Sequence, residues 1–136
     1  ASIIPDGHHL PAAVAKVVVR VKTPRRLVVT CDASSLAGLP PGRYREWGAE
    51  FDVLPTGKIV VPGTPFLAGS GHFTDACVGT LIRQTGVSLA DAVDMATARP
   101  RELMGLPPRT LAVGEPAELV VFDWEPGGDL IVRRVS

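Results

Sequence analysis

The stretch that decides the fold is Arg25–Gly38, RRLVVTCDASSLAG. Its apolar, β-rich run, Leu27–Cys31, predicts a buried strand that ends at a carboxylate, Asp32, followed by small turn-forming residues. In parallel α/β sheets, ligands and catalytic groups gather at the carboxyl ends of strands. Asp32 therefore has two interpretations. It is either a catalytic acid at a strand tip, or a residue that begins a turn and satisfies nearby backbone amides.

A second strand and a helix precede this stretch. Ala1–Pro5 is a short apolar run without an initiator Met, as we expect of a fragment, and it leads into a polar cluster at residues 6–9, DGHH. Pro11 suits the first turn of a helix. Four valines follow at helical spacing and predict its buried face: Val14, Val17, Val18 and Val21. Residues 1–32 thus predict a βαβ unit with parallel strands and a right-handed crossover.

The rest of the chain alternates between turn-rich and periodic segments. Residues 36–65 hold five prolines and predict loop structure containing one hairpin, and Gly63–Gly71 predicts a glycine-rich loop. Three helices are expected next, the first over His72–Gln84 and ended by Gly86, the second capped by Ser88, and a short third after Pro100 that stops at Gly105. Two final strand candidates, Ala117–Asp123 and Leu130–Val135, predict a hairpin outside the βα pattern.

Composition indicates a soluble globular domain, or part of one. The chain has 136 residues, of which 46% are hydrophobic, and its 14 basic and 14 acidic residues cancel. No global field therefore favours nucleic acid or an anionic membrane as partner. Apolar stretches fall short of the roughly 20 residues that a membrane span needs, and no signal segment opens the chain, so we expect a cytoplasmic protein. The two cysteines, Cys31 and Cys77, are expected to be reduced thiols, although their spacing leaves a bridge open.

The candidate chemical groups are few. Adjacent His8 and His9 point to opposite sides of an extended backbone, so at most one faces a site and they do not bind one metal together. Each is either a site residue or a surface hydrogen-bonding residue. The glycine loop lacks the ending of a phosphate-binding P-loop, and Ser70 has no base beside it in sequence. At one face of a parallel barrel, however, Asp32, His9 and this loop would meet.

Three motifs follow one another along the chain: Asp6-Gly7-His8-His9, then Thr30-Cys31-Asp32-Ala33, then Leu67-Ala68-Gly69-Ser70. This ordered set resembles the C-terminal third of the N-acetylglucosamine-6-phosphate deacetylases, a family of the amidohydrolase superfamily. A later run, Val113–Asp123, is similar to a segment shared widely across that superfamily. The resemblance covers nearly the whole chain.

The resemblance implies a C-terminal fragment of a metal-dependent (β/α)8 barrel hydrolase with part of its small β-sandwich. Residues 1–110 would be the last part of the barrel, with a loop and hairpin insertion at 36–65, and residues 111–136 would be strands of the sandwich. Because such a barrel takes about 250 residues, 136 residues cannot supply all of it. Exposed strand edges and uncovered apolar surface then predict a homo-oligomer.

The resemblance also assigns roles to residues. Asp32 matches the catalytic acid/base that takes a proton from metal-bound water and passes it to the leaving amine. His9 matches a substrate-contacting histidine, while Leu67, Ala68 and Gly69 match a loop that contacts an amino sugar phosphate through its backbone. The divalent metal, zinc or a similar ion, would be held by a Glu and two His from earlier strands. No metal ligand is therefore expected among these 136 residues, and the chain by itself is expected to be inactive.

Two other functions remain open at this point. The parent enzyme would be a related amidohydrolase that acts on a cyclic amide or a dipeptide, or the chain would be a non-catalytic α/β interaction module whose polar strand ends are only surface.

Overall fold

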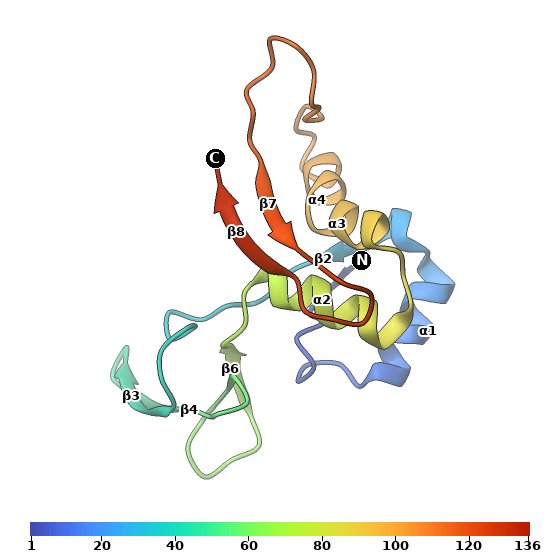
Figure 1. Cartoon of the computed structure of the whole chain (residues 1–136). Helices are drawn as coiled ribbons and strands as arrows, with labels where there is room; N and C mark the ends of the chain where they lie inside the picture. Colours follow the sequence, from blue (N-terminus) through green and yellow to red (C-terminus); the bar gives the residue numbers. More distant parts are fainter.

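The computed structural model describes residues 1–136 and contains three small sheets and four α-helices (Figure 1). In chain order the elements are β1 (Ser2–Ile3), α1 (Ala12–Lys22), the 3-10 helix η1 (Pro24–Arg26), β2 (Val28–Val29), β3 (Gly42–Glu46), β4 (Ala49–Val53), β5 (Lys58–Val60), β6 (Leu67–Ser70), α2 (Thr74–Thr85), α3 (Leu89–Ala96), α4 (Ala98–Leu103), β7 (Val120–Asp123) and β8 (Ile131–Val135).

The predicted βαβ unit is confirmed. β1 and β2 pair in parallel, with Ser2 opposite Val28 and Ile3 opposite Val29, and α1 lies between them in the chain. Both strands are shorter than the sequence predicts, although Leu27 before β2 is fully buried. Since β1 pairs only with β2, its other edge carries no strand.

The predicted buried face of α1 is wrong for three of its four valines. Val14, Val17 and Val21 are 43%, 60% and 73% exposed, and Ala15 is the residue of this helix that is fully buried. The helix lies chiefly on α2 and η1, and Val18 and Val19 are partly buried against the main core, so only a narrow strip of the helix is covered. A small side chain allows this close approach, and most of the valine stripe is left without a neighbour.

The main core forms where α2 and α3 pack on the two parallel strands. Its ten buried residues are Ile3, Leu27, Val29, Cys77, Val78, Leu81, Val87, Ala92, Met95 and Leu130. Local chemistry ends these helices as predicted. Gly86 adopts the left-handed conformation after α2, and the Ser88 hydroxyl accepts the Asp91 amide at the start of α3. Both cysteines are free.

The third helix begins earlier than predicted. α4 starts at Ala98, so Pro100 lies inside its first turn instead of preceding it. A proline is tolerated there because the first amides of a helix have no intrahelical acceptor.

Residues 42–70 form a four-stranded sheet, where the sequence predicts a loop containing one hairpin. β3, β4, β5 and β6 make one antiparallel sheet in that order, which includes the predicted hairpin, with Val53 opposite Ile59. β3 escaped prediction because GRYRE is mostly polar, and the Trp47-Gly48 turn with positive φ at both residues joins it to β4. β6 lies within the stretch Gly63–Gly71 that was expected to be a loop.

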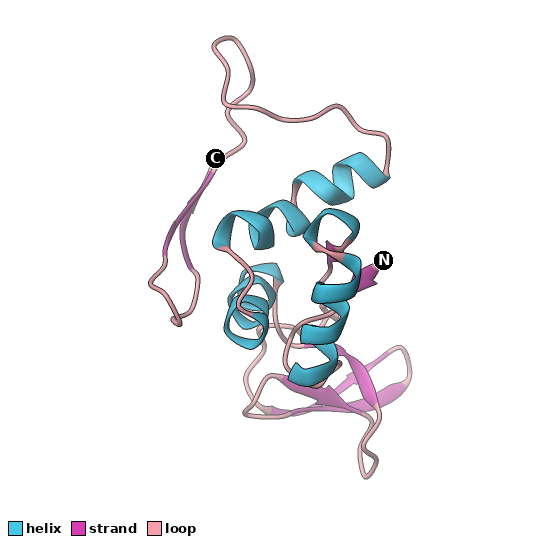
Figure 2. Ribbon diagram, turned by 90° about the vertical axis from the view of Figure 1, so that its right-hand side faces the viewer, coloured by secondary structure: helices cyan, strands magenta, loops and turns pink.

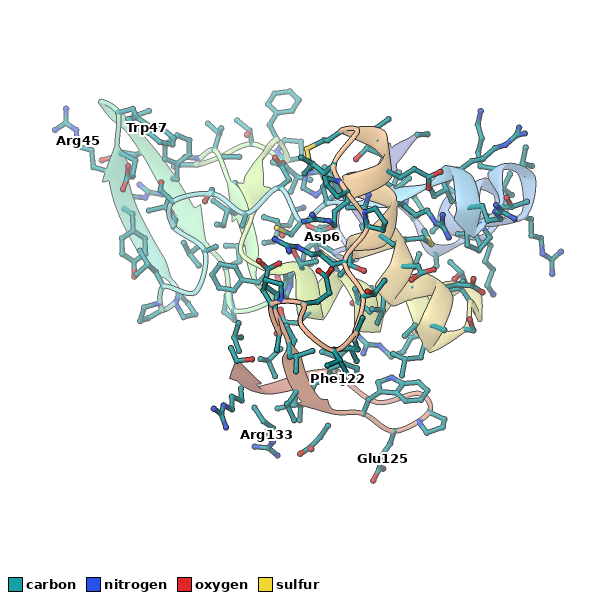
Figure 3. The ribbon with its side chains drawn as sticks, turned by 90° about the horizontal axis from the view of Figure 1, so that it is seen from above. Asp6, Arg45, Trp47, Phe122, Glu125 and Arg133 are labelled. Atoms are coloured by element: carbon teal, nitrogen blue, oxygen red, sulfur yellow. The ribbon has the colours of Figure 1, made fainter.

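This sheet extends from the helical part of the molecule (Figure 2), and Arg45 and Trp47 mark its far end in Figure 3. Its own small core contains Leu36, Val53 and Ile59. The predicted C-terminal hairpin is confirmed as β7 and β8. Every residue of β8 is exposed, so the hairpin rests on the helices chiefly through Phe122 and Leu130. No helix of the structure is long and apolar enough to cross a membrane.

A substitution that creates a cavity at the centre of the main core is expected to destabilise the chain strongly. Leu81 is fully buried, so Leu81→Ala should lower the free energy of unfolding by about 2–5 kcal/mol in urea titrations. The matched control is Leu111→Ala, because Leu111 is 83% exposed and its truncation should change stability by less than about 0.5 kcal/mol. Equal losses in the two variants would contradict this assignment of the core.

Candidate functional site

The ends of β1, β2 and β6 come together, and the candidate residues lie there. Asp6 and His9 follow β1, Asp32 follows β2, and Ser70 closes β6. Figure 3 shows Asp6 in the middle of the molecule, away from the exposed tip of the sheet. This arrangement follows from the parallel pairing of β1 with β2, because parallel strands deliver their carboxyl ends to one edge.

Asp6 is the most heavily bonded side chain of this group. Its Oδ1 accepts the backbone N–H groups of His8 and His9, both at 2.9 Å, and its Oδ2 lies 2.9 Å from Nδ1 of His9. The Asp6 side chain is only 1% exposed. Burial by itself would raise its pKa, but the hydrogen bonds from His9 and His8, together with the Ser70 hydroxyl, hold the pKa below the ordinary 3.8.

His9 connects Asp6 to Asp32. The other ring nitrogen of His9, Nε2, lies 3.4 Å from Oδ2 of Asp32, whose side chain is 52% exposed. Asp6, His9 and Asp32 therefore form a row that runs from the interior to solvent. Asp32 has a φ of 53°, a conformation that non-glycine residues seldom adopt.

β6 is held directly against Asp32. The Ser70 amide donates to the Asp32 carbonyl at 2.7 Å, and the Ser34 amide donates to the Ser70 carbonyl at 3.0 Å. These bonds make a parallel bridge between Ala33 and Ser70. Leu67, Ala68 and Gly69 thus approach the Asp32 turn as part of a strand, and Ser70 is 1% exposed.

His8 and His72 lie on the other side of the DGHH turn. Their rings stack with centroids 5.6 Å apart, and Nε2 of each faces the carbonyl oxygen of Thr56, at 3.1 and 3.2 Å. The two adjacent histidines, of which at most one was expected to face the site, thus have different neighbours, since His9 lies near Asp32 and His8 near the Thr56 carbonyl. His8 instead fastens the turn between β4 and β5.

Sequence reasoning did not single out Asp6 as a site residue. The signal was present, since an Asp two and three residues before two histidines is placed to accept their backbone amides. The contact of Asp6 with the His9 ring depends on the side-chain conformations, which sequence does not give.

The donors of this chain do not form a complete metal site. No group of three or more His, Cys, Asp or Glu side chains is arranged to hold an ion. At the strand ends, both oxygens of Asp6 are already engaged by His8 and His9. A metal would need further ligands from outside these 136 residues.

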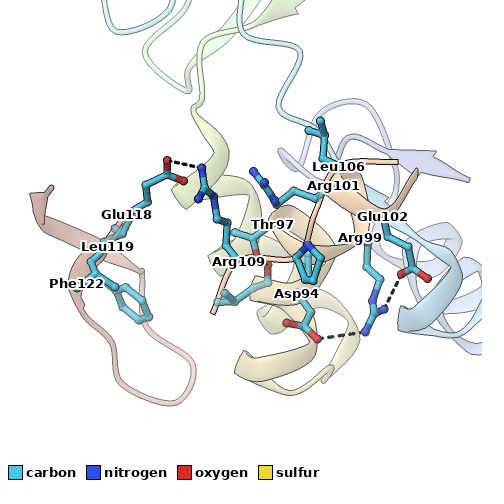
Figure 4. Close-up of a pocket in the computed structure, with 14 residues that line it drawn as sticks. Asp94, Thr97, Arg99, Arg101, Glu102, Leu106, Arg109, Glu118, Leu119 and Phe122 are labelled. Atoms are coloured by element: carbon cyan, nitrogen blue, oxygen red, sulfur yellow. Dashed lines mark hydrogen bonds and ion pairs between the residues drawn. The ribbon is translucent and has the colours of Figure 1, made fainter. Parts of the chain in front are cut away.

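A pocket of about 670 Å³ lies elsewhere, between α4 and the segment that leads into β7 (Figure 4). Two of its three arginines form ion pairs within the pocket. Arg99 lies 2.8 Å from Glu102 and 3.3 Å from Asp94, and Arg109 lies 3.2 Å from Glu118. Because none of the strand-end residues lines it, this pocket is separate from the candidate site.

Comparison with known proteins identifies the class first. Two solved structures of N-acetylglucosamine-6-phosphate deacetylases share this fold. The enzyme of Mycobacterium smegmatis, solved with N-acetyl-D-glucosamine-6-phosphate, has a TM-score of 0.84 and 31% identity over 99% of this chain and 35% of its own. The Thermotoga maritima enzyme has a TM-score of 0.79 and 27% identity over 98% of this chain and 38% of its own.

Curated relatives then identify the family. A protein of Escherichia coli (strain K12), provisionally assigned as an N-acetylgalactosamine-6-phosphate deacetylase, is 36% identical over 89% of this chain and 72% of its own length. The human N-acetylglucosamine-6-phosphate deacetylase is 34% identical over 89% of this chain. The chain belongs to the N-acetylglucosamine/N-acetylgalactosamine-6-phosphate deacetylase family. It spans about a third of the length of most of these relatives, for instance 30% of the human enzyme, and no family model matches it.

The close approach of β6 to Asp32 predicts a specific effect of Gly69→Ala. A Cβ at Gly69 would lie 3.0 Å from the Asp32 carbonyl oxygen and from Cβ of Ser34, whereas a Cβ at Gly63 would meet nothing within 4 Å. Both glycines have positive φ, so Gly63→Ala is the matched control. Urea unfolding should show Gly69→Ala to be less stable than Gly63→Ala by about 1–3 kcal/mol. Equal stabilities would mean that β6 does not press on the Asp32 turn.

Proposed function

We propose that this chain is the C-terminal part of a metal-dependent hydrolase that removes the N-acetyl group from an amino sugar phosphate. The observation that carries the proposal is the row of Asp6, His9 and Asp32 at the ends of two parallel strands, with β6 packed beside it. The names of the relatives support this substrate class.

Asp32 is proposed as the catalytic acid/base. Its carboxylate is half exposed and so is accessible to water, while the β6 bridge fixes its backbone. It would accept a proton from the attacking water and return that proton to the departing amine, which leaves acetate and the free amino sugar phosphate. A carboxylate suits both steps because it is charged at neutral pH and is protonated only during the reaction.

His9 and β6 are proposed as the substrate-binding groups. His9 is 19% exposed and borders Asp32, so a bound sugar would contact its ring and the carboxylate together. Leu67, Ala68 and Gly69 are half-buried and would offer backbone groups to the sugar phosphate.

The rest of the proposed enzyme lies outside this chain. Residues 1–110 would contribute the last strands and helices of a (β/α)8 barrel, and residues 111–136 would contribute strands to a small β-sandwich. A divalent metal, zinc or a similar ion, would be bound by a Glu and two His of earlier barrel strands.

Replacement of Asp32 is the direct test. In the full-length enzyme, Asp32→Asn should leave metal content unchanged and lower the rate of acetate release by about 10²–10⁴-fold, because an amide cannot accept the proton from water. Asp129→Asn is the control, since Asp129 is an exposed partner of Arg83 far along the chain. Near-normal turnover by Asp32→Asn would sink the assignment. Two other outcomes would indicate the alternative functions. Turnover of cyclic amides or dipeptides in place of acetylated amino sugar phosphates would indicate a different amidohydrolase. Absence of activity even when the missing part of the enzyme is supplied would indicate an interaction module.

Uncovered apolar surface leads to a second expectation, that the chain self-associates. Val17 and Val21 on α1 and Val135 on β8 are 60–73% exposed, and the free edge of β1 offers unpaired backbone groups. Light scattering at high concentration should give a mass above the 14.3 kDa of one chain. A strictly monomeric species would contradict this expectation.

A further inference from the structure

We propose that Asp6 is a positioning residue that holds His9 in the Nδ1–H tautomer and aims its Nε2 at Asp32. The importance of this for the reaction rests on the proposed function. The tautomer itself does not, because it follows from hydrogen bonding within this chain.

Hydrogen bonds hold the Asp6 carboxylate in one orientation. Its Oδ1 accepts two backbone amides of the chain segment that carries the ring, those of His8 and His9. Carboxylate and imidazole are thus fastened to the same short turn, which leaves Oδ2 in one direction. Oδ2 lies 2.9 Å from Nδ1 of His9, a full hydrogen-bond contact.

The proton in the hydrogen bond between Asp6 and His9 has a defined position. An ionised carboxylate has only acceptors, and the many donors around Asp6 favour its ionised form. The proton of this bond must therefore sit on Nδ1 of His9. In a neutral imidazole the other nitrogen, Nε2, then carries the lone pair.

The other ring nitrogen of His9 faces Asp32. Nε2 of His9 lies 3.4 Å from Oδ2 of Asp32, and two lone pairs would face each other there if neither group held another proton. The pair is thus arranged to receive one hydrogen from a bound sugar, whose O–H would be donated to Nε2. The opposite tautomer would occupy Nε2 with a proton and place the Nδ1 lone pair against Asp6.

The other two histidines provide an internal reference of opposite sign. His8 and His72 both direct Nε2 at the carbonyl oxygen of Thr56, which is an acceptor with two lone pairs. Both are therefore expected as Nε2–H tautomers. The same molecule should contain one histidine of one tautomer and two of the other.

The test is a long-range ¹H–¹⁵N correlation spectrum of the ¹⁵N-labelled 136-residue chain at about pH 8.5, where free imidazole is neutral. His9 should show a protonated Nδ1 and an unprotonated Nε2, with the reverse pattern at His8 and His72. A predominantly Nε2–H tautomer at His9 in the unmodified chain overturns the proposal, and this measurement requires no variant to fold.

Asp6→Asn tests the cause. Its amide can donate to Nδ1, so His9 should shift toward the Nε2–H tautomer while His8 and His72 keep theirs. Asp52→Asn, which removes the β4 carboxylate that pairs with Arg43, should leave all three unchanged. An Asp6→Asn chain that folds and keeps His9 fully in the Nδ1–H tautomer overturns the role of Asp6.

Kinetics of the full-length enzyme separate the two proposals. Asp6→Asn should lower kcat about 10–100-fold, a loss of the size that follows removal of the hydrogen-bond partner of a metal-ligating histidine, with metal content unchanged. Unaltered kcat overturns the positioning role in the reaction, although the deacetylase function stands. Absence of deacetylase activity in the unmodified enzyme sinks the proposed function, whereas the tautomer of His9 is decided by the spectrum alone.

Discussion

A buried carboxylate must be surrounded by donors, and this requirement at Asp6 organises the centre of the molecule. Its side chain is almost entirely inaccessible, so the charge is tolerable only because His8 and His9 donate to it. The Ser70 hydroxyl adds a further stabilising interaction from the end of β6. One charged group therefore links the turn after β1 with the four-stranded sheet, two parts that have separate hydrophobic cores.

The candidate site lies at this link. Hydrogen bonds between Ser70 and the Asp32 turn bring β6 next to β2, although nearly forty residues separate them in the chain. His8 and His72 add a second connection through the Thr56 carbonyl. The sheet of residues 42–70 thus packs beside the strand ends. Its proline content predicts only a loop insertion.

The sequence correctly predicted helix ends that depend on hydrogen bonds between neighbouring residues. Gly86 ends α2 and Ser88 starts α3 because each satisfies the backbone beside it. The prediction that the valines of α1 are buried was wrong for a different reason. Periodicity reports which side of a helix is apolar, but burial also needs a neighbour, and α1 has neighbours only along a narrow strip that includes Ala15.

The sequence by itself determined the βαβ order, the strand that delivers Asp32, and the motifs that resemble the deacetylase family, because these depend on residues close together in the chain. The resemblance already selected His9, but only the tertiary structure decided that Nε2 of His9 faces Asp32 and that Asp6 contacts the other nitrogen of the ring. The physical reason is that a hydrogen bond between side chains depends on backbone direction and rotamer to within a fraction of an ångström. Those directions are set by the pairing of β1, β2 and β6, which no single segment contains.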